Sequence, residues 1–284
     1  MQRIGPRPPW FPMMAPLLLS MEPAFVVLTD LSSSAEAALL YTTQLARHVN
    51  GRVVLLHVYL DPLLELEVSL VPATVQVASR QEIMANMAKR TQQLGVPALI
   101  ELSDDSLEVA VQHMILRYHP LLLAAWREAP HTAVASQARY PLLLVPETWT
   151  GAGLPRRVVV AADEQSFGLT PPALALAPLL QALQAKTTLV HASPGRGPAP
   201  LDAALLAVGR TGLFGGLTGS DVYEVPEEAP APGVLRACAE LGAELLVVPA
   251  RPHTLLGGVF HRSVTAELLR RSPIPVLVLP ITEA

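Results

Sequence analysis

Short apolar runs recur along the chain and are separated by longer mixed segments. In the first half these runs lie at residues 24–29, 53–58, 97–102, 121–125 and 142–145. They show little alternation of apolar and polar residues, which is typical of strands buried on both faces of a sheet. The mixed segments with helical signals cover residues 35–49, 78–94 and 106–118. Strands that alternate with helices predict a parallel α/β sheet.

The same pattern then starts again. In the second half, strands are predicted at residues 157–162, 187–191, 222–225, 245–248 and 276–279, and helices at residues 201–208, 233–241 and 263–271. The proline-flanked apolar run at residues 141–146 returns at residues 275–280, a separation of 134 (275 − 141). Asp30, which follows the first strand, has its counterpart in Asp163, a separation of 133 (163 − 30). The repeat predicts a chain built from two similar halves.

The predicted boundaries follow from this repeat. The polar, glycine-containing stretch ETWTGAGLP at residues 147–155 is the expected linker. It separates a first domain at residues 23–146 from a second at residues 156–284. Residues 1–22 are expected to be a flexible leader, because prolines interrupt the apolar core that a signal peptide would need.

Composition narrows the functional classes. The 284 residues are 51% hydrophobic and 15% charged, and the mean hydropathy is +0.38, but no apolar run is long enough to span a bilayer. The net charge is −4 without a dense Lys/Arg cluster, which disfavours nucleic acid and anionic membranes as partners. A lone cysteine, Cys238, fits a buried position and a cytoplasmic location. No Cys/His set has the spacing of a metal site.

Taken together, these features resemble the universal stress protein family. The shared marks are an aspartate and a serine after each first strand and a histidine at each second strand: Asp30 with Ser32, Asp163 with Ser166, and His57 with His191. The resemblance implies a tandem member with two flavodoxin-like or Rossmann-like domains of the adenine nucleotide alpha hydrolase type. Each would hold a five-stranded parallel sheet with helices on both faces. The two would pair as a pseudo-dimer through the proline-flanked strands.

The family's ATP-binding loop is degenerate in this sequence. In relatives that bind ATP, the loop after the fourth strand has the form G-x-x-G, nine residues, then G-[S/T], and its glycines let the backbone approach the phosphates. In the second half Pro249, Pro252 and Arg262 stand at the three glycine places and only Ser263 is kept. Proline has no N–H to donate. Residues 126–141 of the first half contain no glycine. Neither half is therefore expected to bind ATP in the usual manner.

An alternative stays open for the second half. Arg251, His253 and Arg262 bring cations near Ser263, where the last helix is predicted to begin, and could rebuild an anion site for ATP or AMP. Asp163 would belong to the same site, because the resemblance implies that this aspartate contacts the nucleotide.

In the first half, Asp30 and Ser32 are the corresponding candidates, and their competing role is to cap the following turn and helix. His57 and His191 are interpreted as structural residues at strand ends, since no carboxylate or Cys/His partner shares their spacing.

The sequence favours a binding module over an enzyme. It contains no G-x-G-x-x-G, G-x-x-x-x-G-K-[ST], G-x-S-x-G or H-E-x-x-H motif. We expect a stress-response regulator that acts through contact with an unidentified protein partner, without tight ATP binding. Two alternatives remain: a nucleotide sensor or weak ATPase in the second domain, and a small-molecule binder that uses the apolar residues 60–77. A homodimer in addition to the intrachain pair is compatible with the sequence.

Overall fold

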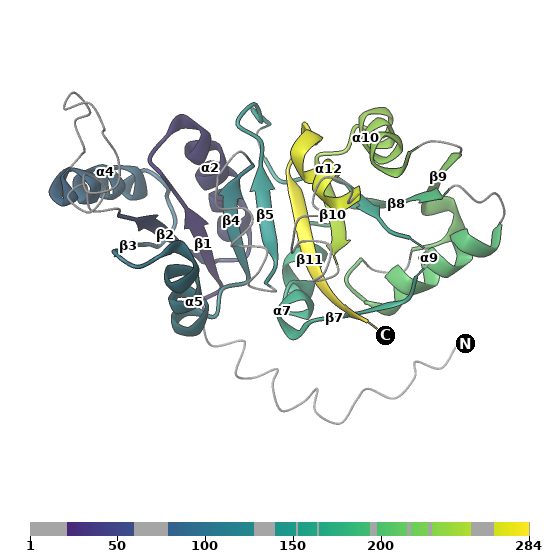
Figure 1. Ribbon diagram of the computed structural model, residues 1–284, viewed down its shortest axis with the longest axis horizontal. Helices are drawn as coiled ribbons and strands as arrows, with labels where there is room; N and C mark the ends of the chain where they lie inside the picture. Colours follow the sequence, from purple (N-terminus) through teal and green to yellow (C-terminus); the bar gives the residue numbers. More distant parts are fainter. Residues whose placement is uncertain are drawn as a thin grey trace.

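The computed structural model describes residues 22–59, 79–127, 140–151, 153–163, 165–193, 198–214, 217–226, 229–250 and 264–283. The first half contains the strands β1 (Ala24–Leu28), β2 (Arg52–Val58), β3 (Ala98–Ser103), β4 (Leu122–Trp126) and β5 (Leu142–Val145). All neighbours pair in parallel, in the order β3-β2-β1-β4-β5. Helices α2 (Ser33–His48) and α4 (Arg80–Gln92) lie on one side of this sheet and α5 (Leu107–Tyr118) on the other (Figure 1).

Serine caps explain where these three helices begin. The hydroxyls of Ser32, Ser79 and Ser106 each accept a hydrogen bond from the backbone N–H three residues later. Glu82 completes a capping box by accepting from the backbone N–H of Ser79 at 2.7 Å. The predicted helices of the first half are thus present, with boundaries shifted by a few residues.

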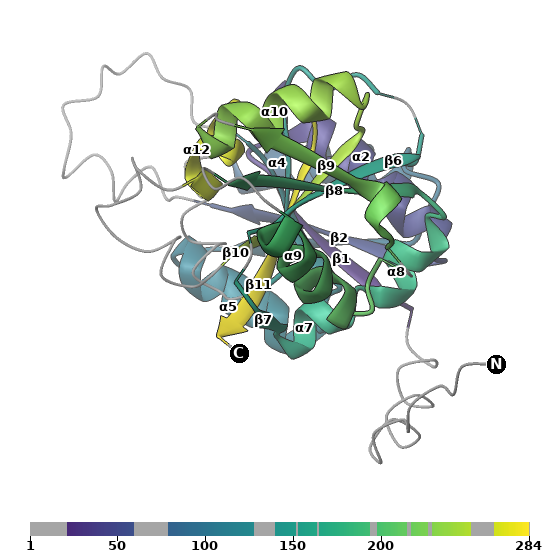
Figure 2. The same ribbon diagram turned by 90° about the vertical axis from the view of Figure 1, so that its right-hand side faces the viewer.

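The second half repeats the sheet with its own five strands: β6 (Arg157–Ala161), β8 (Lys186–Ser193), β9 (Val222–Pro226), β10 (Leu245–Ala250) and β11 (Val276–Glu283). Their order, β9-β8-β6-β10-β11, repeats that of the first half, and all four pairings are parallel. The helical elements are α7 (Pro171–Leu174), α8 (Ala177–Ala182), α9 (Pro198–Arg210), η1 (Gly219–Asp221), α10 (Pro230–Glu240) and α12 (Val264–Arg271). Figure 2 shows α10 and α12 on one side of the sheet and α7 and α9 on the other. The predicted tandem α/β fold is confirmed.

One region of the second half departs from the repeat. A short strand, β7 (Phe167–Leu169), follows the first-strand aspartate and pairs antiparallel with residues 281–283 of β11. The two short helices α7 and α8 then take the place of the 16-residue α2. We expected the last strand to end before Pro280, and this was wrong. The Pro280 carbonyl accepts the Thr170 N–H at 3.3 Å, and the ladder continues past a residue that has no N–H to give.

The two halves join through β5 and β11. These strands pair antiparallel, with Leu143 opposite Leu277 at the centre of three residue pairs, and both leucines are buried. Figure 1 shows the two strands side by side in the middle of the molecule. The predicted seam of the pseudo-dimer is therefore confirmed.

Hydrogen bonds between helices and loops reinforce this seam. The Arg127 guanidinium donates to the Ser272 carbonyl, and a His48 ring nitrogen lies 2.8 Å from the Ala182 carbonyl. The linker also packs against α2, because Trp149 meets the Tyr41 ring edge-on with centroids 6.4 Å apart. No helix in the described ranges is long and apolar enough to cross a membrane.

Candidate functional site

The carboxyl end of β1 forms the first-half candidate site, and its side chains are used locally. Asp30 Oδ1 accepts the backbone N–H of Ser32 at 2.8 Å, and Ser32 Oγ accepts the N–H of Ala35 at 3.2 Å. Between them Leu31 has a φ of 66°, held by a 2.9 Å hydrogen bond from its N–H to Thr29 Oγ1. Asp30 and Ser32 therefore shape the turn and cap α2, which is the competing role that the sequence suggested.

A cation from α4 is bound at the same turn. One nitrogen of Arg90 donates to the Leu31 carbonyl at 2.6 Å, and another donates to Glu36 Oε2 at 2.6 Å. Glu36 lies in the first turn of α2, where it interacts favourably with the positive end of the helix dipole. Because the donors of Arg90 are already engaged, they are not directed to an incoming phosphate. This contact was not predicted from the sequence, since no local motif connects Arg90 to a carbonyl 59 positions away.

Trp126 occupies the place where the family's loop would have its first glycine. The registers establish the equivalence: Leu122 pairs with Phe25 in the first half as Leu245 pairs with Val158 in the second. Four residues further on, Trp126 corresponds to Pro249. The Trp126 indole is only 4% exposed, so it packs into the end of the sheet. Trp126 thus contributes a large buried side chain at a place where a glycine would have none.

In the second half, Asp163 follows β6 as Asp30 follows β1, but the segment after it has a different structure. Asp163 is half-buried, and its Oδ1 accepts the backbone N–H of Gln165 at 3.1 Å. Ser166 is exposed and leads into β7 rather than capping a helix. The turn after β6 is therefore not followed directly by a helix N-terminus, in contrast to the turn after β1.

At the carboxyl end of β10, Pro249 is part of the sheet and pairs with Leu279 of β11. The candidates Arg251, His253, Arg262 and Ser263 lie outside the described residues, and α12 begins one residue later at Val264. Their convergence on one site stays a prediction.

The two strand-end histidines have equivalent roles. His57 Nδ1 lies 2.8 Å from the Thr29 carbonyl, and His191 Nδ1 lies 3.1 Å from the Ala162 carbonyl. A carbonyl can only accept, so each Nδ1 carries the proton and ties the second strand to the first. This geometry agrees with the structural interpretation of both residues.

Other chemistry is limited in the described part of the chain. Burial raises the pKa of the Cys238 thiol to about 12, so it stays protonated at neutral pH and is a poor nucleophile. No group of three His, Cys, Asp or Glu residues there is arranged to hold a metal ion.

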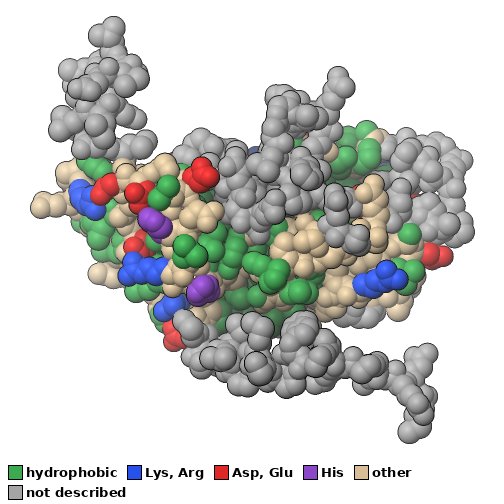
Figure 3. Space-filling model, turned by 60° about the horizontal axis from the view of Figure 1, so that its bottom comes forward, with side chains coloured by type: hydrophobic (Ala, Val, Ile, Leu, Met, Phe, Trp, Pro, Cys, Tyr) green, Lys and Arg blue, Asp and Glu red, His purple; other side chains and the backbone are tan. Residues whose placement is uncertain are grey.

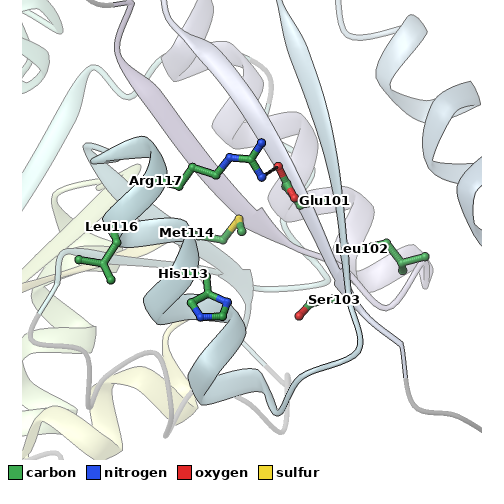
Figure 4. Close-up of a pocket in the computed structure, with 7 residues that line it drawn as sticks. All are labelled: Glu101, Leu102, Ser103, His113, Met114, Leu116 and Arg117. Atoms are coloured by element: carbon green, nitrogen blue, oxygen red, sulfur yellow. Dashed lines mark ion pairs between the residues drawn. The ribbon is translucent and has the colours of Figure 1, made fainter.

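An open groove of about 430 Å³ lies between β3 and α5, with Ser103, Met114 and Arg117 among its lining residues (Figure 4). A smaller hollow of about 220 Å³ lies in the second half, with Leu180, Thr187 and Phe214 among its lining residues. Neither is lined by the candidate nucleotide residues. The apolar residues 60–77, which the sequence suggested for a small-molecule site, lie outside the described ranges.

One family profile matches the second half of the chain. Residues 155–280 match the profile of the universal stress protein family. The second half of the chain is a universal stress protein domain. A search of curated protein sequences found no match.

Solved universal stress proteins share the fold of both halves. One from Archaeoglobus fulgidus is 18% identical with a TM-score of 0.57, and the match covers 90% of this chain and 95% of that chain. A Pseudomonas aeruginosa protein described as a universal stress protein is 15% identical with a TM-score of 0.57, covering 93% of this chain and 94% of the other. The alignments extend over both halves, so both halves share the fold of these proteins. At these identities the likeness concerns fold alone.

Proposed function

We propose that this universal stress protein is a cytoplasmic stress-response module that works through contact with a protein partner and binds ATP tightly in neither half. We assign it no reaction of its own. The observation that carries the proposal is the buried Trp126 indole at the place of the loop's first glycine.

Three further features of the first half support the absence of an ATP site. Asp30 is engaged by the backbone of its own turn. Arg90 is bound to the Leu31 carbonyl and to Glu36. The acidic Glu36 at the start of α2 would repel a phosphate at that helix N-terminus. A nucleotide would have to displace these contacts and the indole together.

The second half lacks backbone donors at two of the loop's three glycine places. A phosphate cradle needs flexible residues whose N–H groups point to the anion. Pro249 is held in the β10–β11 ladder and has no N–H, and a second proline stands at the next glycine place, residue 252. Side-chain cations would have to replace those donors entirely for nucleotide to bind there.

Isothermal titration of the purified chain with Mg-ATP and with AMP tests the proposal. We expect no saturable heat at ligand concentrations up to about 1 mM, where the binding free energy would be only about −4 kcal/mol. The ratio of absorbance at 260 and 280 nm should show no co-purified nucleotide. A thermal shift should also be absent, because a ligand at 100 times its Kd would stabilise the protein by about 2.7 kcal/mol.

Micromolar affinity would contradict the proposal. If Arg262→Ala then abolished that binding while Arg90→Ala did not, the nucleotide sensor of the second half would be the correct function. Stoichiometry provides a second check, since a second-half site predicts one nucleotide per chain.

A further inference from the structure

β3 is the last strand of the sheet in the first half, and among the described residues no strand pairs with its outer edge. β3 stands at the end of the strand order and pairs with β2 over all six of its residues. At the two ends of this pairing, the Val53 N–H donates to the Pro97 carbonyl at 2.9 Å, and the Tyr59 N–H donates to the Ser103 carbonyl at 2.7 Å. In a parallel ladder alternate residues face the same neighbour. The odd-numbered residues of β3 therefore point their N–H and C=O groups toward β2.

The backbone N–H and C=O groups of the even-numbered residues consequently point away from β2. These residues are Ala98, Ile100 and Leu102. Within the described ranges, no recorded hydrogen bond uses these outward backbone groups. Proteins usually protect such an edge with proline, lysine or a bulge. The strand sequence ALIELS contains neither proline nor lysine, and it pairs without a bulge. As far as the described residues go, three donors and three acceptors thus have no strand partner.

Exposed apolar side chains lie beside this edge. Leu99 on β3 is 40% exposed, and Leu116 on α5, which lines the groove with residues of β3, is 69% exposed. In Figure 3, hydrophobic side chains lie among acidic and basic ones over the first half. Exposed apolar area beside an open edge is typical of a surface that another chain covers.

The charges at this edge are already paired within the chain. The ion pairs are Arg117–Glu101 at 2.9 Å, Arg80–Asp104 at 2.5 Å and His113–Asp105 at 3.5 Å. Two identical surfaces repel each other when each carries unbalanced charge of one sign. Here Glu101 and Asp104 each have an arginine partner, and Asp105 lies beside His113, which is charged only when protonated, so a second copy would meet little unbalanced charge.

We propose that β3 pairs antiparallel with β3 of a second copy of this chain, about a twofold axis at Ile100. In this register Ile100 faces Ile100 of the second copy, and Ala98 faces Leu102. All three outward residues then form hydrogen-bonded pairs, each exchanging two backbone bonds. Moving the axis by one residue would place Glu101 against Glu101 of the second copy, where like charges destabilise the pairing.

The groove beside β3 fits this arrangement. Leu99 and Glu101 lie on the sheet face toward α5, because Glu101 bonds the Tyr118 hydroxyl and alternate residues share a face. Leu99 of the second copy would lie opposite Glu101, beside the groove lined by Met114 and Leu116 (Figure 4). The seam within the chain already shows that three antiparallel residue pairs join two such sheets.

Sedimentation velocity and light scattering, measured from about 1 µM to about 1 mM, would test this interface. We expect a monomer–dimer equilibrium for the full chain. Leu99→Glu should raise the dimer dissociation constant at least about tenfold, because the new carboxylate of each copy would lie opposite Glu101 of the other, and like charges directly opposite each other destabilise the pairing. The matched control is Leu206→Glu on α9, since Leu206 is an exposed leucine of the second half, and it should leave the equilibrium unchanged.

A second variant separates interface loss from misfolding. Ile100→Pro removes an N–H that points away from β2, so the β2–β3 ladder keeps its bonds while the dimer loses two. We expect a monomer with an unchanged far-UV spectrum. A chain that stays monomeric over the whole concentration range overturns the proposal and leaves the edge to an extended peptide. A dimer that survives both variants also overturns it, because its contact must then lie elsewhere.

Discussion

At the residue scale, equivalent positions of the two halves have diverged in different ways. Trp126 and Pro249 both replace a glycine of the family's loop, one by filling space and the other by removing an N–H. The sequence revealed the loss of glycine, but it did not reveal that the indole would be buried or that Arg90 would bind the neighbouring turn. Both facts depend on packing between segments distant in the chain.

Replacing Arg90 with alanine should destabilise the fold by about 1–2 kcal/mol, because the Leu31 carbonyl and Glu36 lose their partner. The lower end of that range reflects the partial exposure of the ion pair, with side-chain exposures of 21% and 36%. Urea unfolding at neutral pH measures the change. Lys89→Ala, one residue earlier on α4 and exposed, is the matched control and should change stability by less than about 0.5 kcal/mol. Equal effects of the two variants would show that the contacts of Arg90 with the Leu31 carbonyl and Glu36 do not stabilise the fold.

At the element scale, local caps explain why the first-half helices could be predicted. Ser32 and Ser106 marked the starts of two of these helices in the sequence, and the structure shows that these serines and Ser79 each accept the capping bond. The corresponding region of the second half was harder, because residues 164–185 contain three prolines and form β7, α7 and α8 instead of one long helix. The β7 pairing exists only because β11 runs on to Glu283.

The capping box of α4 predicts a pH dependence. Hydrogen bonds from the Ser79 backbone and hydroxyl lower the pKa of Glu82 below its ordinary 4.5. Because the folded-state pKa is depressed, the stabilisation is present above pH 4.5 and is lost as pH falls through the lower folded-state value. The stability difference between the protein and Glu82→Gln should be constant from about pH 7 to about pH 5 and shrink below that. Urea titrations at each pH measure this stability difference. A difference that grows on acidification would contradict a stabilising role for the capping box.

At the scale of the whole molecule, one antiparallel contact joins two parallel sheets. β5 and β11 are covered by helices and by each other, and Leu142, Leu143, Val276 and Leu277 are each at most 2% exposed. Neither half could leave this edge open without exposing apolar strands to water. The two domains should therefore unfold as one cooperative unit.

Leu143→Asp or Leu277→Asp should cost more than about 4 kcal/mol, since each would bury a carboxylate without a partner. Chemical denaturation followed by far-UV circular dichroism measures the loss. Leu40→Asp on α2, where the leucine is 50% exposed, should stay within about 0.5 kcal/mol of the parent. If Leu143→Asp left the transition single and its midpoint unchanged, β5 and β11 could not be the seam.

The sequence by itself determined the strands, most helices and the duplication, because a run of apolar residues requires burial and a serine or glycine sets a helix end wherever the chain goes. It also identified the proline-flanked runs that pair at the seam. Only the tertiary structure decided that Arg90 binds the turn after β1, that Trp126 is buried in the core and that no described strand covers the outer edge of β3. These outcomes depend on contacts between distant segments, whose geometry local patterns of hydrophobicity do not encode.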